Sequence, residues 1–356
     1  MYLVIAEKPS VSRAIAEVIG AQEREDGYLQ GTDCMVSWCF GHLAEYVSPD
    51  AYDEKFNQWR YEDLPIIPKD WKVTVSEDKK DQFYILKRLL NSPEIEYVVN
   101  ACDAGREGEL IFKHVYDLSG SKKPVKRLWI SSLEDSAILD GMQHLRSAEE
   151  YRHLAEAAVC RSQADWLVGM NATRAYTTKY FKKLTVGRVQ TPTLAMIAHR
   201  EQQIRSFKPE DYYGLRCTTS VTGGSVGTMA SIVTWTWQQK KSGSLRSFNK
   251  ELITGLDKKL KNQTLTVTDV HTSSKRTPSP GLYDLTELQR DANKRFGFSA
   301  KETLNIMQSL YEHHKVLTYP RTDSRYIGTD IVPTIKERLK ACNIGPYKKY
   351  IPELLK

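Results

Sequence analysis

Apolar runs of strand length alternate with helix-spaced apolar residues over roughly the first 150 positions of the chain. The runs predict buried strands at residues 2–6, 97–101 and 125–130. The helical spacing predicts helices at residues 11–19 and 81–91 and from about residue 110. Ser10 is a suitable N-cap for the first of these helices, and Gly20 is suited to end it. Strands that alternate with helices predict a parallel α/β sheet in this part of the chain.

The rest of the chain changes character several times, which predicts a multidomain protein of α/β plus α+β class. Residues 149–205 follow a mostly helical pattern, and helical spacing returns from 285 to 310 after a linker-like run at 272–280. The intervening part is β-rich, with strand-like stretches at 212–217, 231–237 and 265–270. The four predicted units span residues 1–148, 149–208, 209–278 and 279–356.

A short polar segment near residue 320 holds a tyrosine two positions before an arginine. Tyr319 offers a phenol oxygen as a nucleophile, and Arg321 offers a planar fork of donors for a phosphate. Covalent phosphoryl transfer, which splits one difficult displacement into two easier ones, suits this pairing. A surface turn is the alternative, because Pro320 fixes φ and the following Thr-Asp-Ser favours capping. Taken alone, the segment is better explained as a turn.

Carboxylates follow two of the predicted strands. Glu7 comes directly after the first strand, and Asp103, Glu107 and Glu109 come after the second. Because the carboxyl ends of parallel strands share one edge, these acids can converge there and hold Mg²⁺, which prefers oxygen ligands. Helix capping is the alternative, since acids complement the dipole of a helix N-terminus, and it is the better explanation for Glu109. Lys8, beside Glu7, is suited to protonate a leaving oxygen or to hold a phosphate.

Basic and aromatic residues interleave between positions 161 and 191. Arg188 and Gln190 lie at the start of a predicted helix, where they are suited to contact phosphates and base edges. Upstream residues have the pattern of a single-strand groove, in which charges follow the backbone and rings stack on bases. They are Arg161, Gln163, Asp165, Asn171, Thr173, Arg174, Tyr176 and Tyr180. For any one of them, a solvated helix face is at least as good an explanation.

Charge and cysteine usage narrow the setting without fixing a function. The formal net charge of +7 permits a polyanionic partner but does not demand one. The six cysteines include no C-x-x-C pair, which favours reduced, mostly structural thiols in a cytoplasmic setting. The apolar runs are too short to predict a membrane span, and the N-terminus lacks signal-peptide features. No G-x-x-x-x-G-K-[ST] motif occurs, so a P-loop ATPase is not expected.

Together, these segments resemble the type IA DNA topoisomerases, and most closely the bacterial topoisomerase III branch. The resemblance rests on separate motifs in the right order from residue 1 to about 330. They are the toprim-like 4–10, Gly41-His42-Leu43 with Trp59 and Leu64-Pro65, the acidic toprim-like 103–109, the DNA-contacting 187–192, and 283–292, which leads into the tyrosine segment. The resemblance implies a toprim domain at 1–148, a helical DNA-binding domain at 149–208, a partial β arch at 209–278 and a partial catalytic tyrosine domain at 279–356.

The resemblance also implies a role for each candidate residue. Tyr319 would attack single-stranded DNA and become linked to its 5′ phosphate, Arg321 would stabilise phosphoryl charge, and Lys8 would assist the leaving 3′ oxygen. Glu7, Asp103 and Glu107 would bind Mg²⁺, chiefly for ATP-independent resealing. The substrate would be single-stranded or negatively supercoiled DNA of a bacterial nucleoid or plasmid. The implied DNA-contacting residues are Arg161, Asp165, Arg174, Gly187, Arg188, Val189, Gln190, Thr191 and Arg321.

Two departures from the family pattern limit what is expected of this chain alone. Gly105 stands where the family commonly has a second aspartate, which removes one potential Mg²⁺ ligand unless Glu107 substitutes. The chain ends at Lys356, and the family motif His-x-Ala-Ile-Arg-Pro-Thr is absent. We therefore expect an N-terminal fragment, a natural truncation or one half of a split enzyme whose C-terminal part acts in trans. A non-catalytic remnant that binds single-stranded DNA is the alternative. A toprim nuclease or primase is not favoured, because it would need neither Tyr319 nor the 187–192 motif.

Overall fold

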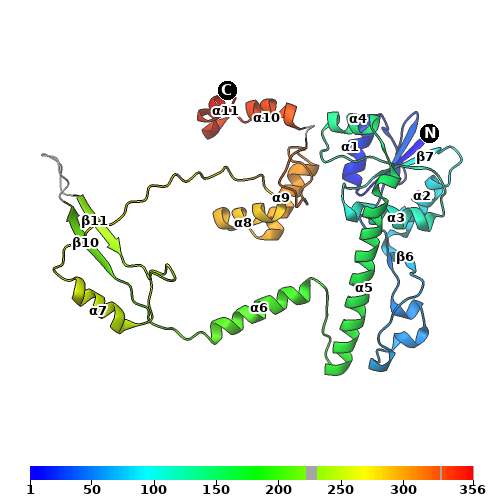
Figure 1. Cartoon of the computed structure of the whole chain (residues 1–356). Helices are drawn as coiled ribbons and strands as arrows, with labels where there is room; N and C mark the ends of the chain where they lie inside the picture. Colours follow the sequence, from blue (N-terminus) through cyan, green and yellow to red (C-terminus); the bar gives the residue numbers. More distant parts are fainter. Residues whose placement is uncertain (222–230, 329–330, 356) are drawn as a thin grey trace. The chain divides into compact units, whose positions relative to one another are not determined.

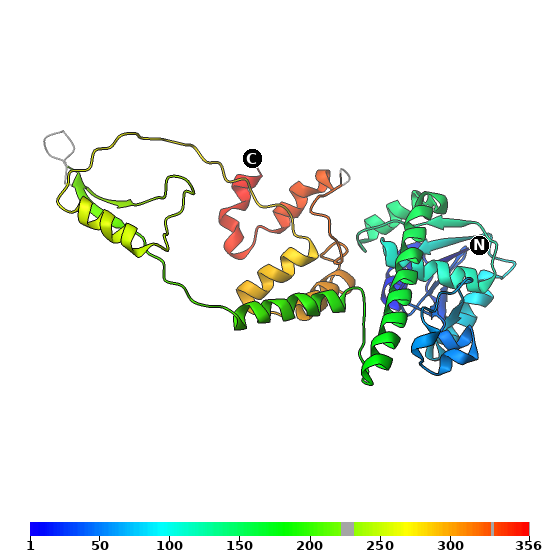
Figure 2. The ribbon, with the colours of Figure 1, turned by 60° about the horizontal axis from the view of Figure 1, so that its bottom comes forward.

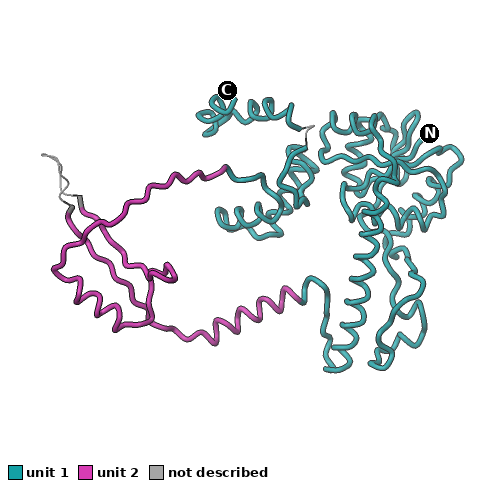
Figure 3. The backbone as a smooth tube through the Cα atoms, viewed as in Figure 1, with its two compact units in different colours: residues 1–191, 279–356 teal, residues 192–278 magenta. Residues whose placement is uncertain are grey.

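The chain forms two compact units in a computed structural model, which describes residues 1–221, 231–328 and 331–355 (Figure 3). The larger unit comprises residues 1–191 and 279–356, and the smaller comprises residues 192–278. The larger unit contains a seven-stranded sheet, and it also contains all the predicted catalytic residues.

The sheet of the larger unit is parallel at its centre and antiparallel at its edges. Its strands are β1 (Tyr2–Ala6), β2 (Glu23–Glu25), β3 (Tyr28–Gln30), β4 (Cys34–Trp38), β7 (Tyr97–Ala101), β8 (Val125–Arg127) and β9 (Arg146–Ser147). They lie in the order β2-β3-β4-β1-β7-β8-β9, and β4, β1, β7 and β8 are mutually parallel. The predicted parallel α/β sheet is confirmed, although its third predicted strand ends at residue 127 instead of 130. The antiparallel edge strands were not predicted.

Helices cover both faces of this sheet, and each face has its own hydrophobic core (Figure 1). The helices are α1 (Pro9–Ile19) and α4 (Asp135–Gln143) on one face and α2 (Lys80–Leu90) and α3 (Arg106–Ser119) on the other. Successive side chains of a strand point to opposite faces, so β1 supplies Val4 to the first core and Leu3 to the second. This packing fixes the ends of the parallel strands, where the candidate site lies.

The first helix begins earlier than the sequence predicts. Its N-cap is Lys8 and its first residue is Pro9, whereas Ser10 was predicted as the cap. Proline is favoured at this position because its φ suits a helix and the N–H that it lacks would have no partner in the helix. Gly20 ends α1 in the left-handed region, with φ of 83°, as predicted.

The other elements connect this sheet to the rest of the chain. They are β5 (Ala44–Tyr46), β6 (Val73–Val75), α5 (Arg152–Tyr180), α6 (Gln190–Arg205), α8 (Leu285–Phe296), α9 (Ala300–Glu312), α10 (Ile335–Ala341) and α11 (Ile351–Leu354). α5 is one continuous helix of 29 residues (Figures 1 and 2). Trp166 of α5 donates a hydrogen bond to the Val47 carbonyl at 3.1 Å, and Asn171 is hydrogen-bonded to the backbone of Ile66. None of the described helices combines the length and apolar character needed to cross a bilayer.

The end of α9 and the segment after it pack onto the α/β sheet. The Tyr319 N–H donates to the Ser131 carbonyl at 2.8 Å. The side chains of Tyr311, Leu317 and Tyr319 contact the core beneath α1. This packing brings the tyrosine segment to the ends of strands that lie far away in the sequence.

The smaller unit contains a two-stranded antiparallel sheet, of β10 (Arg216–Val221) and β11 (Ser231–Thr236), and α7 (Lys250–Leu260). The strand predicted at 265–270 is wrong, because residues 263–284 contain neither helix nor strand. A strand must pair its N–H and C=O groups with a neighbour, and the described residues provide this segment with none. The sequence did not predict α7, whose N-cap Asn249 accepts a hydrogen bond from the Leu252 N–H at 2.9 Å.

Candidate active site

Two carboxylates meet at the carboxyl ends of β1 and β7. Glu7 is 9% exposed, and its Oε2 atom has no hydrogen-bond partner among the described residues. Burial, and then the neighbouring Asp103 carboxylate, raise the pKa of Glu7 to about 7. Burial likewise raises the pKa of Asp103, although the charge of Lys8 opposes this. The pair therefore holds buried negative charge that a proton or a cation would relieve.

Tyr319 lies against this pair. Its phenol lies close enough to the Asp103 carboxylate for each group to shift the pKa of the other, and its ring packs edge-on against Tyr311 with the ring centroids 5.8 Å apart. Burial, followed by the charges of Asp103 and Glu7, raises the pKa of Tyr319, and Arg321 opposes this shift. The phenol therefore keeps its proton in this state. Its activation as a nucleophile requires a base for that proton and cations that offset the new charge.

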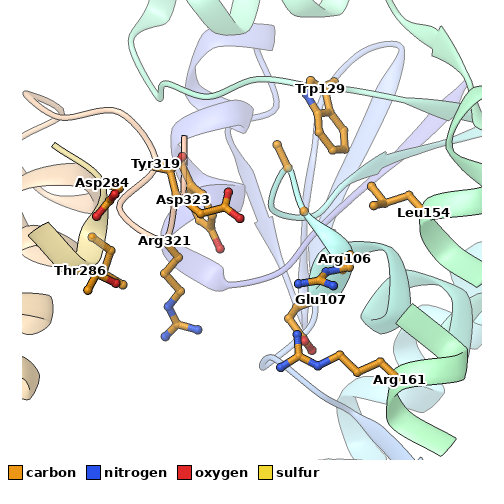
Figure 4. Close-up of a pocket in the computed structure, with 15 residues that line it drawn as sticks. Arg106, Glu107, Trp129, Leu154, Arg161, Asp284, Thr286, Tyr319, Arg321 and Asp323 are labelled. Carbon is orange, nitrogen blue, oxygen red and sulfur yellow. The ribbon is translucent and has the colours of Figure 1, made fainter. Parts of the chain in front are cut away.

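Tyr319 and Arg321 line one side of a cavity of about 770 Å³ (Figure 4). Arg106 and Glu107 from α3 and Arg161 from α5 line the opposite side. The guanidinium of Arg321 is exposed and, within the described ranges, forms no ion pair. Three arginines around one cavity suit a ligand that carries several phosphates.

Lys8 is held by a carboxylate that the sequence did not indicate. Its Nζ donates to Glu312 Oε1 at 2.9 Å, and Glu312 also accepts from Gln308 at 2.7 Å and from Ser10 at 3.2 Å. Burial disfavours the ionised form of Glu312, but the three hydrogen bonds outweigh it and lower the pKa of this carboxyl. Glu312 lies at the end of α9, 304 positions from Lys8, so no local pattern could pair the two.

Glu107, the third predicted metal ligand, faces His42 instead of Glu7 and Asp103. Its Oε2 lies 3.5 Å from His42 Nε2, and its side chain is 53% exposed. Nowhere in the described part of the chain do three His, Cys, Asp or Glu side chains stand together in a way that could hold a metal ion. The predicted set of three carboxylates is therefore not assembled in this structure, which pairs Glu7 with Asp103.

The two glycines at the start of α3 differ in what they allow. A Cβ on Gly108 would clash with the Asp103 carbonyl oxygen, so only glycine permits this close approach. The approach arises because α3 begins at Arg106, one turn before the predicted start near Leu110. A Cβ on Gly105 would meet nothing within 4 Å, and the backbone there is extended. The site thus has room for a side chain at position 105.

A buried ion pair holds the loop that carries Asp103. Arg127 is 1% exposed, and its Nε donates to Glu109 Oε1 at 2.7 Å. The guanidinium also donates to the backbone carbonyls of Asn100, Cys102, Asp103 and Leu128. Glu109 is thus structural, as the sequence favoured, but its partner is Arg127 and not merely the helix dipole. The sequence did not single out Arg127, because it lies within a run that was interpreted as an apolar strand.

Most of the predicted DNA-contacting residues are exposed or partly exposed. Asp165 lies between two arginines, 4.0 Å from Arg161 Nε and 3.3 Å from Arg188 Nη1. In the turn before α6, the Gly187 N–H donates to Thr191 Oγ1 at 3.0 Å. The intervening Val189 and Gln190 are exposed. On α5, the exposed rings of Tyr176 and Tyr180 stack with centroids 6.1 Å apart.

Arg174 is placed differently from the other predicted contacts. It is 5% exposed, donates to the Phe56 carbonyl at 2.7 Å and lies over the Trp59 ring at 5.1 Å from its centroid. Burial lowers the pKa of Arg174. A side chain held in this way is not accessible to a strand, so the structure does not fit its predicted contact with DNA. It fastens α5 to the segment between β5 and β6.

Known proteins resemble this chain along almost its whole length. A Toprim domain profile matches residues 2–133, and a DNA topoisomerase profile matches residues 149–356. DNA topoisomerase 3 of Bacillus cereus is 50% identical over 353 residues, and that of Bacillus subtilis is 48% identical over 354 residues. Both alignments cover 99% of this chain but 47% of the relative, so the chain spans about half the length of the curated relatives it matches.

A solved structure shares the fold. Full-length topoisomerase I from Thermotoga maritima aligns with a TM-score of 0.64 at 22% sequence identity. The alignment covers 96% of this chain and 52% of that chain.

Proposed function

The chain belongs to the type IA DNA topoisomerase family, and from this premise we propose that it cleaves and rejoins one DNA strand through Tyr319, without ATP. The observation that carries the proposal is the interaction of the Tyr319 phenol with the Asp103 carboxylate beside Glu7. The nucleophile therefore lines one cavity with three arginines that would bind phosphate, and the carboxylate that would act as its base adjoins it.

In the proposed cleavage step, Tyr319 Oη attacks the phosphorus and forms a P–O bond, while the bond from phosphorus to the 3′ oxygen breaks. Asp103 is the carboxylate that interacts with the phenol, and it would take the phenol proton. Lys8 gives a proton to the leaving 3′ oxygen. The products are a 5′-phosphotyrosine and a 3′ hydroxyl, and resealing is the reverse of this step, so no external energy is needed.

Arg321 supports this step by electrostatics. Its guanidinium is exposed in the cavity and already opposes the rise in the pKa of Tyr319. A donor that is held in place before reaction stabilises developing phosphoryl charge without reorganisation. Lys8 uses one of its three N–H donors on Glu312, so this carboxylate can hold the ammonium in place while another N–H serves the 3′ oxygen.

Glu7 and Asp103 are the residues that would hold Mg²⁺. The unpartnered Glu7 Oε2 and the mutual repulsion of two buried carboxylates fit a cation that prefers oxygen ligands and retains several waters. When bound, Mg²⁺ would neutralise the carboxylates and attract phosphate oxygens, chiefly for resealing. Glu107 would join them only if it left His42.

We infer that the substrate is single-stranded DNA or an unpaired region of negatively supercoiled DNA. Arg161, Arg188 and Gln190 would contact its backbone and bases, and the stacked Tyr176 and Tyr180 would offer faces for bases. Because the relatives are bacterial, we place this activity in the bacterial cytoplasm, on nucleoid or plasmid DNA.

A trapping assay tests the proposed function. The chain is mixed with labelled single-stranded DNA and denatured with detergent, and the Tyr319→Phe variant serves as the control. We expect the unchanged chain to form a covalent adduct and Tyr319→Phe to form none. DNA binding that is salt-sensitive but yields no more adduct than Tyr319→Phe would instead establish a non-catalytic DNA-binding protein. Relaxation of negatively supercoiled plasmid, measured separately, tests strand passage.

A further inference from the structure

A second cavity lies at the antiparallel edge of the sheet, and we call it the edge cavity. It has a volume of about 200 Å³ and shares no lining residue with the cavity at Tyr319. Its polar and aromatic lining comes from α1, β2, β3, β4 and their ends. The polar and aromatic residues are Arg13, Arg24, Glu25, Tyr28 and Trp38, and Pro9 and Leu29 complete the lining.

Donors in the edge cavity lack acceptors. Trp38 Nε1 is buried and has no hydrogen-bond partner among the described residues. Arg13 and Arg24 are exposed and form no ion pair with any residue that the structure describes. Two guanidinium groups against the single carboxylate of Glu25 leave the cavity net positive. A buried N–H without an acceptor is unfavourable, and a bound anion would remove that deficit.

We propose that the edge cavity binds the phosphate ester of a nucleotide. The planar forks of Arg13 and Arg24 match phosphate oxygens, and a turn of the indole ring would let the buried Trp38 N–H donate to another oxygen. The rings of Tyr28 and Trp38 supply apolar faces for the attached sugar or base, and Glu25 can accept from its hydroxyl or amino groups. The volume is below that of pockets for drug-sized ligands, which fits one phosphate with its adjoining ring.

The phosphate has two possible sources with the same chemistry. One is a free mononucleotide. The other is the DNA strand itself, because Trp38 pairs in register with Ala6, the residue before Glu7, and Pro9 follows Lys8 directly. The site does not depend on cleavage by Tyr319, so it goes beyond the proposed function and is tested apart from it.

The experiment measures binding in the Tyr319→Phe background, where no cleavage can occur. The probes are thymidine 5′-monophosphate and an oligothymidylate without terminal phosphates. The test variants are Arg13→Gln with Arg24→Gln, and Trp38→Phe, which keeps a ring but removes the N–H. The matched control is Arg88→Gln, which removes a charge from an exposed position on α2 outside this cavity. Thermal unfolding of each variant verifies the fold.

Either of two results would support the proposal. If the edge cavity takes a free nucleotide, the double arginine variant binds the monophosphate about tenfold to a hundredfold more weakly and binds the oligonucleotide unchanged. If the cavity takes a strand phosphate, the oligonucleotide binds more weakly, and the slope of log affinity against log salt falls by about 0.7 per lost contact. In both cases Trp38→Phe gives a smaller loss and Arg88→Gln gives none.

The proposal is overturned if the folded double variant and Trp38→Phe bind both probes as tightly as Arg88→Gln. The same substitutions in the chain with Tyr319 intact report adduct formation separately. If the edge-cavity proposal is wrong, the substitutions leave probe binding unchanged while the adduct still forms. If the cleavage proposal is wrong, no adduct forms while the substitutions still weaken probe binding.

Discussion

Replacing Glu109 by Gln tests whether the buried ion pair with Arg127 holds the loop of Asp103. The change removes the negative charge but keeps an oxygen that can accept from Arg127 Nε. Because the two side chains are 9% and 1% exposed, the guanidinium would remain charged, buried and without a counter-ion. Breaking such a pair typically costs about 3–5 kcal/mol. The carbonyls that also accept from Arg127 remain, so we expect a loss near the lower limit, about 3 kcal/mol.

The matched control is Glu107→Gln, two residues earlier on the same helix. Glu107 is 53% exposed and faces only a histidine at 3.5 Å, so its replacement should change the stability by no more than about 0.5 kcal/mol. Urea unfolding of the whole chain, monitored by circular dichroism, gives the free energy of unfolding of both variants relative to the unchanged chain. If Glu109→Gln unfolds at the same urea concentration as Glu107→Gln, the pair does not stabilise the sheet and the reasoning is refuted.

Three further predictions concern the residues around Tyr319. The pKa of Glu7 is raised from 4.5 to about 7, so its proton stabilises the fold below pH 4.5 and this stabilisation is lost as the pH rises through 7. Glu7→Gln should therefore be more stable than the unchanged chain by up to ~3 kcal/mol at pH 8 and equally stable at pH 4. Urea titrations at each pH measure this difference. Gly105→Asp should lower by about tenfold the Mg²⁺ concentration that raises the melting temperature, because the site has room for a third carboxylate; a response equal to that of the unchanged chain would contradict this. Glu312→Gln should slow adduct formation by about tenfold without weakening oligonucleotide binding, because Lys8 loses the carboxylate that positions it; an unchanged rate would exclude that role.

The sequence predicts those parts of the structure that follow from local patterns. The runs at 2–6 and 97–101 become β1 and β7, and the rule that parallel strands share one edge brings Glu7 and Asp103 together. The pattern cannot show which distant side chain completes a site. Glu312 is therefore missed, since its partner Lys8 is 304 positions away.

Tertiary packing also overrides local interpretation at particular positions. Arg174 is a residue type suited to contact DNA, yet the backbone of Phe56 and the ring of Trp59 bury it. Glu107 belongs to an acidic motif but turns to His42, and the β-prone 265–270 has no strand to pair with in the described residues. In each case, neighbours from elsewhere in the chain decide the outcome.

The central claim is that Tyr319 becomes linked to the 5′ phosphate of a cleaved strand. The most direct test uses a single-stranded oligonucleotide that carries its label at either the 5′ end or the 3′ end, followed by peptide mapping of the trapped protein. We predict that only the 3′-end label stays with the protein, that the modified peptide contains Tyr319, and that Tyr319→Phe retains no label. Retention of the 5′-end label, or an adduct of equal yield in Tyr319→Phe, would contradict the account.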